Sequence, residues 1–289
     1  MIGRRHGPEL AALALLLSLW PGTALVLGSL TVTPEQVSDA RSYARAALEL
    51  AAGHGYRDRD LPTAYYPVGY AATLSLFHRL WGPEPVVARM ANVCLSVLTL
   101  LGLYASARSL TRSRAAALLA LLGFALYPAD IAYTSLTLSQ PAFNAFALAG
   151  VALCVWFRPA RNWAIVLGGV LLGCATLNRS QGLALPVLLG LLWCFDRARP
   201  QRRAAGVLAL AFVCTLAPWT IRNAYHLQAF VPVSTNGGIN LYIGNNPGAR
   251  GRYRYSAKLE AALVTGLSGP RRGGPNEVIV DWLHGIIGW

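Results

Sequence analysis

Acidic residues and lysine are scarce in this chain. Asp and Glu together number 12, and charged residues make up 13% of the 289 residues, against roughly 25% in an average soluble domain. Lys258 is the single lysine, so the other basic residues are arginines. Because 55% of the residues are hydrophobic, the composition excludes an ordinary soluble globule and predicts an all-α polytopic membrane protein.

Cysteine and histidine are also few, and neither occurs in a metal-binding pattern. No two cysteines form a Cys-x-x-Cys pair, no two histidines form a His-x-x-x-His pair, and each cysteine lies inside an apolar run: Cys94, Cys154, Cys174, Cys194 and Cys214. These patterns exclude a disulfide framework and provide no zinc site, and they are typical of small buried hydrophobes. We predict no metal ligands. The cofactor requirement stays open, including a divalent metal, because no clear ligand set is present.

The net charge is +13, and 11 of the 25 basic residues are arginines in four short segments beside or between apolar spans. The groups are Arg4 and Arg5; Arg108, Arg112 and Arg114; Arg158 and Arg161; and Arg197, Arg199, Arg202 and Arg203. These groups stand before the first predicted span and after every second one, so all of them would lie on the same side of the membrane. By the positive-inside rule that side is the cytoplasm, which predicts a cytoplasmic N-terminus. A nucleic-acid partner is excluded, since a continuous basic patch with interleaved aromatics is missing.

About seven transmembrane helices are predicted. They cover residues 10–30, 86–106, 115–133, 142–157, 163–177, 182–195 and 204–219. Several are shorter than the ~20 residues needed for a straight crossing. We interpret the first as a retained helix, because it is longer than a signal-peptide core and is interrupted by Trp20-Pro21, although a cleaved signal remains the alternative. Residues 1–219 would form the membrane domain, and residues 220–289 would form a loop or tail at the outer face.

The first outer loop, residues 31–85, is predicted to contain an amphipathic helix. Ser38 or Asp39 can cap a helix that continues to about Ala52 and is ended by Gly53. We expect its apolar side to lie along the membrane surface. The aromatic segment from Ala64 to Trp81 is expected to be interfacial or re-entrant, because a crossing there would place every later arginine group outside.

Four of the candidate site residues lie in the first outer loop or at the outer end of the third predicted span. Asp39 can act as a general base for an acceptor hydroxyl, or it can simply cap the helix. The turn that contains Tyr66 and Tyr70 can stack on a sugar, or it can belong to an aromatic belt. Asp130 is a second carboxylate on the same side, or a plain helix end.

Four further candidates lie later in the chain. Gln140 can donate and accept hydrogen bonds but is a poor base and a poor metal ligand. Arg179 and Arg222 can each hold a phosphate at headgroup depth, or snorkel to the interface. Asn236 lies in a Gly- and Asn-rich run whose backbone N–H groups can bind an anion or a sugar.

The ordered set of these segments resembles the GT-C superfamily of membrane glycosyltransferases. It is most similar to the bacterial branch that includes protein O-mannosyltransferases, the aminoarabinose transferase of lipid A and the rhizobial lipopolysaccharide transferases. The motifs that carry the resemblance are Asp39 with Tyr43, Gly53-His54-Gly55-Tyr56, Tyr66-Pro67-Val68-Gly69-Tyr70, Arg89-Met90-Ala91-Asn92, Tyr127-Pro128, Ser139-Gln140-Pro141, Arg179, and Pro218-Trp219 with Arg222-Asn223. They extend over about residues 9–251.

The resemblance implies an inverting glycosyltransferase in a bacterial inner membrane. The donor would be a polyprenyl-phosphate sugar, and the acceptor a glycolipid, a polysaccharide or a protein. Asp39 would be the base, and Tyr43, Tyr66, Tyr70, Asp130, Gln140, Arg179, Arg222 and Asn236 would bind substrates.

The sequence departs from the family pattern at two points. Gln140 stands where the family often has an acidic residue, and family members usually continue beyond the length of this chain, which implies a C-terminally truncated copy. The alternatives are an inactive or accessory membrane subunit that binds a lipid-linked sugar, or a small transporter.

Overall fold

The computed structural model describes residues 20, 38–58, 61–157, 161–196, 201–237 and 240–241. The chain divides into two compact units, residues 1–233 and 234–289, which are described separately. The elements of the first unit are α2 (Ser38–Ala51), β1 (Arg57–Asp58), β2 (Leu61–Pro62), α3 (Gly69–Trp81), α4 (Pro85–Thr111), α5 (Arg114–Ala125), α6 (Pro128–Tyr133), α7 (Gln140–Trp156), α8 (Asn162–Asn178), η3 (Ser180–Leu183), α9 (Ala184–Cys194) and α10 (Arg202–Leu227). The described part of the chain is mostly helical, as the composition predicts.

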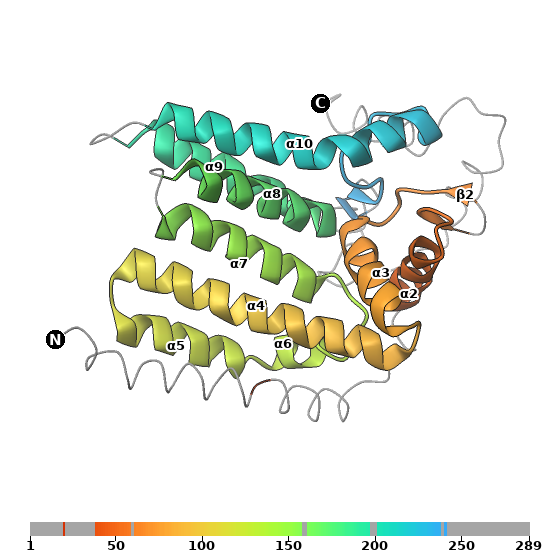
Figure 1. Cartoon of the computed structure of the whole chain (residues 1–289), viewed down its shortest axis with the longest axis horizontal. Helices are drawn as coiled ribbons and strands as arrows, with labels where there is room; N and C mark the ends of the chain where they lie inside the picture. The colour runs from red at the N-terminus through yellow and green to blue at the C-terminus, as the bar shows by residue number, and fades with distance from the viewer. Residues whose placement is uncertain are drawn as a thin grey trace, which may run out of the picture. The chain divides into compact units, whose positions relative to one another are not determined.

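The long helices of the first unit form a bundle. Helices α4, α5, α7, α8, α9 and α10 lie side by side, and α2 and α3 lie across one end of them (Figure 1). Helix α4 packs against α5 and α7, α7 packs against α8, and α8 packs against α10. The helix pairs approach closely through small residues: a Cβ atom at Gly102 would lie 2.8 Å from the backbone of Leu148 and Ala149 in α7. Such contacts are typical of helix packing in membranes.

Two of the described helices, α4 and α10, are long and apolar enough to cross a membrane. Helices α5, α7, α8 and the segment from η3 to α9 are also apolar but shorter. Large apolar side chains face outward on α9 and α10, including Leu188, Leu192 and Leu210, and an exposed apolar surface of this kind requires a nonaqueous partner. The count of seven spans remains a prediction, and the segment expected at residues 10–30 lies outside the described residues apart from Trp20.

The segment predicted as a span over residues 115–133 is broken into two helices. Helix α5 ends at Ala125, and α6 begins at Pro128. A proline lacks a backbone N–H and disfavours helical geometry at the residue before it, and Tyr127 is accordingly extended. The last predicted span also differs, because α10 continues past Trp219 to Leu227.

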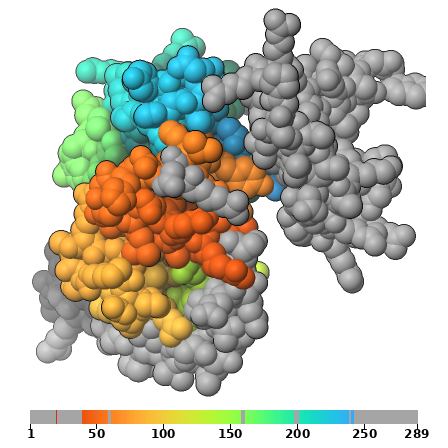
Figure 2. Space-filling view, turned by 90° about the vertical axis from the view of Figure 1, so that its right-hand side faces the viewer, coloured from red at the N-terminus to blue at the C-terminus, as the bar shows by residue number. Residues whose placement is uncertain are grey.

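Helix α2 confirms the predicted helix in the first loop, but not its place on a membrane surface. The helix runs from Ser38 to Ala51, and Gly53 has a left-handed φ of 84°, the conformation that glycine adopts most readily. Its apolar residues Tyr43, Ala46 and Ala47 are buried in a cluster with α3. Figure 2 shows α2 in red-orange at this end of the molecule. The amphipathic side of the helix therefore packs against protein.

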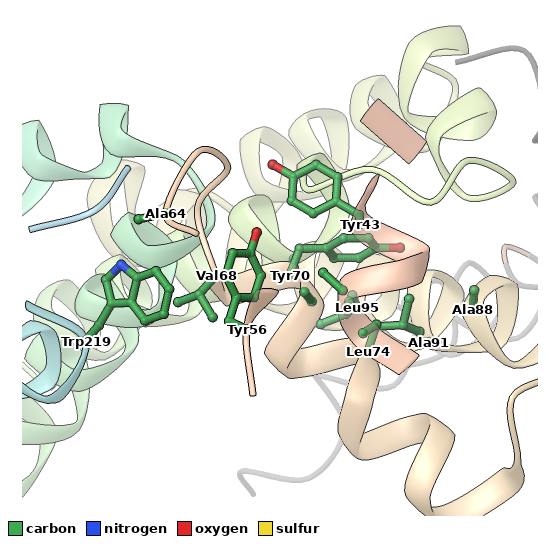
Figure 3. Close-up of a cluster of buried hydrophobic side chains, with 14 of the residues drawn as sticks. Tyr43, Tyr56, Ala64, Val68, Tyr70, Leu74, Ala88, Ala91, Leu95 and Trp219 are labelled. Atoms are coloured by element: carbon green, nitrogen blue, oxygen red, sulfur yellow. The ribbon is translucent and has the colours of Figure 1, made fainter. Parts of the chain in front are cut away.

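The core at this end of the bundle combines apolar side chains with one buried polar group, Asn92. Tyr70, Leu74 and Leu95 belong to its apolar part (Figure 3). The Tyr70 hydroxyl donates to Asn92 Oδ1 at 2.9 Å, and Asn92 Nδ2 donates to the carbonyl of Leu136 at 2.7 Å and to that of Thr134 at 3.3 Å. Asn92 is 1% exposed. It thus links α3, α4 and the loop before α7 through hydrogen bonds that water cannot replace.

Replacement of Asn92 by Ala should lower the thermal stability of the purified protein. The substitution removes the acceptor of the buried Tyr70 hydroxyl and the amide that donates to the carbonyls of Thr134 and Leu136. A buried group left unsatisfied costs about 1–3 kcal/mol. Tyr70→Phe removes one of these hydrogen bonds and should cost less. Thermal unfolding in detergent, followed by tryptophan fluorescence, measures both variants.

Met90→Ala serves as the matched control for the Asn92 variant, because Met90 lies in the same helix and is 47% exposed. Its midpoint should stay near that of the unmodified protein. An Asn92→Ala protein as stable as the Met90→Ala protein would contradict this account of the core.

Candidate functional site

The candidate site lies at the end of the bundle where α2 and α3 cover the helix ends. The segments that meet there are α2, the turn before α3, the first residues of α7 and the residue after α8. Several of the predicted site residues are brought together here although the sequence separates them by more than a hundred positions. The structure thereby groups Asp39, Tyr43, Tyr66 and Arg179.

Asp39 and Tyr66 form the central hydrogen bond of the site. The Tyr66 hydroxyl donates to Asp39 Oδ1 at 2.7 Å. Asp39 lies in the first turn of α2, where the helix dipole favours a negative charge, and its side chain is partly exposed. Burial raises the pKa of Tyr66, and the hydrogen bond to the Asp39 carboxylate raises it further. Tyr66 therefore stays protonated and serves as a neutral donor that orients the carboxylate.

Tyr43 connects this pair to the ends of α7 and α8. Its ring centroid lies 5.3 Å from that of Tyr66 and 5.5 Å from that of Tyr70. Burial raises the pKa of Tyr43, while a hydrogen bond with Ser139 and the positive charge of Arg179 oppose the rise. The Arg179 cation and the Asp39 carboxylate thus act on the Tyr43 hydroxyl electrostatically, with opposite signs.

Tyr70 is placed differently from the other predicted tyrosines. It is 0% exposed, and its hydroxyl is bound to Asn92. Glycine at position 69 lets this helix start approach α8, because a Cβ atom there would lie 2.6 Å from both Asn178 Nδ2 and the Leu177 carbonyl carbon. Tyr70 consequently supports Tyr43 from within the core.

Arg222 holds the first loop against α10. Its guanidinium donates to the carbonyl of Thr63 at 2.8 Å and to the carbonyl of Tyr56, and it lies over the Trp219 ring at 4.9 Å. Trp219 Nε1 donates in turn to the carbonyl of Val233 at 2.7 Å. We call Arg222, Trp219 and these carbonyls the loop clamp. Tyr56 continues the chain of contacts, since its hydroxyl donates to the carbonyl of Tyr66 at 3.1 Å.

Asp130 and Gln140 lie at the start of α6 and α7. Asn144 Nδ2 donates to Asp130 Oδ1 at 3.1 Å, so this second carboxylate is paired with α7. Gln140 Oε1 is buried and has no hydrogen-bond partner among the described residues. An orphaned buried acceptor is costly and calls for an explanation. Within the described ranges, no group of three or more His, Cys, Asp and Glu side chains is placed to hold a metal ion.

Asn236 belongs to the second unit, residues 234–289. Its Oδ1 accepts a hydrogen bond from Ser234 Oγ at 2.9 Å, which is a local turn contact. Most of the Gly- and Asn-rich run that was expected to bind an anion or a sugar lies outside the described residues.

Sequence reasoning missed the specific roles of Tyr56, Asn92 and Asn223. All three occur in the motifs that resemble the GT-C superfamily, yet their side chains bind the protein itself: Asn223 Nδ2 donates to the carbonyl of Val231 at 2.9 Å. Arg89, in the same motif as Asn92, has a buried Nε without a hydrogen-bond partner among the described residues. The motif positions were visible in the sequence, but their partners were not.

Arg222→Gln should loosen the first loop. A glutamine amide cannot reach both loop carbonyls and stack on Trp219, and hydrogen bonds from charged groups contribute about 1.5–3 kcal/mol each. Trypsin cleavage after Arg57 should therefore become at least about tenfold faster, since 1.4 kcal/mol corresponds to a factor of ten. Timed proteolysis in detergent, read by mass spectrometry, gives the rate.

Arg179→Gln is the control for the proteolysis experiment, because it removes a neighbouring arginine that is not part of the loop clamp. Its cleavage rate should match that of the unmodified protein. Unchanged cleavage in Arg222→Gln would show that Arg222 does not restrain the loop.

Comparison with known proteins gives one family match. A family model described as dolichyl-phosphate-mannose-protein mannosyltransferase matches residues 73–231, more than half of the 289 residues. No curated protein matches significantly, and no solved structure does. The matched range contains Asp130, Gln140, Arg179 and Arg222, whereas Asp39, Tyr43, Tyr66 and Tyr70 precede it.

Proposed function

Because the chain belongs to the dolichyl-phosphate-mannose-protein mannosyltransferase family, we propose that it is a membrane glycosyltransferase of the GT-C type. It transfers a sugar from a polyprenyl-phosphate donor to a glycolipid, polysaccharide or protein acceptor. The reaction takes place at the outer face of a bacterial inner membrane, and the N-terminus is cytoplasmic. The grouping of basic residues between apolar segments supports this orientation.

The single observation that carries the assignment of the base is the hydrogen bond between Asp39 and Tyr66. It fixes a partly exposed carboxylate at the end of an apolar bundle, where a donor held in the lipid and an acceptor from water can meet. Tyr66 orients it without competing for the proton, since burial raises the pKa of that phenol.

The reaction is a substitution at the anomeric carbon. Asp39 accepts the proton of the acceptor hydroxyl as that oxygen forms a bond to the anomeric carbon. The bond between the anomeric carbon and the phosphate oxygen breaks at the same time, and its electron pair leaves with the polyprenyl phosphate. Attack from the side opposite the phosphate inverts the configuration of the sugar.

Arg179 is the better candidate of the two predicted arginines for stabilising the leaving phosphate. Arg222 already donates to the carbonyls of Tyr56 and Thr63, so its donors are engaged in the loop clamp. Arg179 follows the end of α8 and acts electrostatically on Tyr43. A guanidinium there faces the charge that develops on the phosphate, and such stabilisation is often the largest catalytic contribution.

An accessory subunit that binds a lipid-linked sugar without transferring it is the second candidate function. Gln140 favours it, because an amide cannot ionise. Its buried Oε1 without a partner among the described residues can accept a hydrogen bond from a bound sugar in either case. The two candidates differ only in whether transfer occurs.

Asp39→Asn should reduce sugar transfer by about 10²–10⁴-fold, the usual contribution of a general base. The amide keeps the size of the side chain and can still accept the Tyr66 hydrogen bond, so donor binding should persist. The assay incubates protein in native-like lipid with radiolabelled polyprenyl-phosphate sugars and a membrane glycolipid extract, and counts label in the acceptor.

Arg41→Gln is the matched control for the base variant. Arg41 lies on the exposed side of the same helix, and its removal should leave transfer near the unmodified rate. Undiminished transfer by a folded Asp39→Asn protein would refute the role of Asp39. Donor binding without transfer by the unmodified protein would favour the accessory subunit.

Arg179→Gln should weaken donor binding and slow transfer together. The substitution removes a positive charge next to the proposed phosphate position, and a charged hydrogen bond lost there costs about 1.5–3 kcal/mol, or roughly ten- to a hundredfold. Arg179→Lys should restore part of the loss, because the charge returns without the planar fork. Binding of a fluorescent polyprenyl phosphate, titrated by anisotropy, separates this effect from the chemistry; equal affinities in all three proteins would rule out the contact.

A further inference from the structure

A small polar pocket adjoins the candidate base. It lies between α2, the β1–β2 hairpin and the turn before α3, and its cavity volume is about 70 Å³. We call it the hairpin pocket. Its lining residues are Ser42, Arg45, Ala46, Tyr56, Arg57, Asp58, Thr63, Tyr65 and Tyr66. The cavity admits one polar substituent rather than a whole sugar ring, and it is partly open, so the rest of a ligand can remain outside.

The hairpin pocket and Asp39 share the Tyr66 side chain. Tyr66 lines the pocket, and its hydroxyl donates to Asp39 Oδ1 at 2.7 Å. Ser42 and Ala46 also lie three and seven residues after Asp39, which places all three on one side of α2 within about two helical turns. A molecule seated in the pocket is therefore beside the carboxylate that would accept its proton.

The charges in the hairpin pocket favour an anion. Arg45 and Arg57 contribute two positive charges, and Asp58 contributes one negative charge. The ion pair between Arg45 and Asp58 has side chains that are each 54% exposed, and a pair this exposed is weak. An incoming carboxylate or phosphate can displace Asp58 and bind the planar guanidinium in a bidentate manner.

Tyr65 supplies a surface next to the charged groups. Its ring contacts that of Tyr66 edge to face at a centroid distance of 4.8 Å, and the residue is 40% exposed. A tyrosine fixed in this way presents an apolar face with a polar tip at low entropic cost. A sugar ring can rest on it while an acidic substituent enters the cavity.

We propose that the hairpin pocket is the acceptor site and that the acceptor is an anionic sugar, carrying a carboxylate or a phosphate. The acidic substituent binds Arg45 and Arg57, and the sugar ring lies against Tyr65. A neighbouring hydroxyl is thereby presented to Asp39. This inference rests on the proposed glycosyltransferase function and names its acceptor class.

The test compares charge changes of opposite sign in the pocket. Arg57→Gln should raise the KM for an acidic acceptor by about tenfold, with the KM for the donor unchanged. Asp58→Asn should lower the acceptor KM by about threefold, because the carboxylate that competes with the acceptor for Arg45 is removed. The probes are soluble oligosaccharides ending in glucuronate, in glucose 6-phosphate or in glucose, and the glucuronate and phosphate arms decide which anion is preferred.

A merely structural role of these residues would not change the acceptor KM in opposite directions in the two variants. If Arg45, Arg57 and Asp58 only stabilised the hairpin, Arg57→Gln and Asp58→Asn would both weaken acceptor use, or neither would change it. Arg41→Gln, outside the pocket on the same helix, should leave the acceptor KM unchanged. Equal use of the neutral and acidic sugars by the unmodified protein would overturn the proposal.

Direct binding separates this proposal from the transferase assignment. Saturation-transfer NMR with the same three oligosaccharides, without donor, should detect the acidic sugars in the unmodified and Asp39→Asn proteins and lose their signal in Arg57→Gln. Such binding without any transfer would support the hairpin pocket as an anion-binding site while refuting the enzymatic function. Transfer to acceptors with no Arg57-dependent binding would sustain the enzyme and refute the pocket.

Discussion

The hydrogen bonds from Arg222 to the backbone of the first loop hold the candidate site together. They join residues that are 159 and 166 positions apart, so no local structure can replace them. The carbonyl of Tyr56 accepts a hydrogen bond from Arg222, and its hydroxyl donates to the carbonyl of Tyr66. The Tyr66 hydroxyl in turn donates to Asp39. A guanidinium is suited to this task because its rigid fork binds several acceptors and also stacks on Trp219. The position of the Asp39 carboxylate therefore depends on a contact made by a residue of α10.

Buried amides provide a second set of constraints within an apolar bundle. Lipid-facing helices gain little from hydrophobic association in a membrane, and small residues and interhelical hydrogen bonds take over part of that role. Asn92 and Asn223 are both nearly unexposed and bind backbone carbonyls of following loops. Each side chain holds a loop between helices or after a helix in place, rather than joining two helices to each other. The loops that shape the site are consequently held as firmly as the helices.

The sequence predicted the helical class, the helix in the first loop and most of the later helices. Hydropathy and proline positions suffice for those elements, since they depend on neighbours in the chain. It did not locate the helix break at Tyr127-Pro128. It also did not show that the apolar side of α2, expected along the membrane surface, packs against α3, because that contact depends on tertiary structure. Asp39, Tyr43, Tyr66 and Arg179 were among the candidates named from the sequence, and their role as site residues stays a prediction. The sequence did not show that Arg222 and Tyr70 bind the protein itself. Their hydrogen-bond partners, two carbonyls of the first loop and the Asn92 amide, are known only from the fold.

The family match and the candidate site occupy adjoining parts of the chain. The matched range begins in α3, whereas Asp39, Tyr66 and the hairpin pocket lie mainly before it. Helices α4, α7, α8 and α10 supply a rigid base on which the first loop is mounted, and functional residues are often carried by loops that a rigid scaffold positions. The loop clamp and Asn92 are the points where the scaffold meets that loop. Under the proposed function, a donor bound by the helical part and an acceptor bound by the loop would meet at Asp39. Arg222, which holds the loop against α10, would then help to set the distance between them.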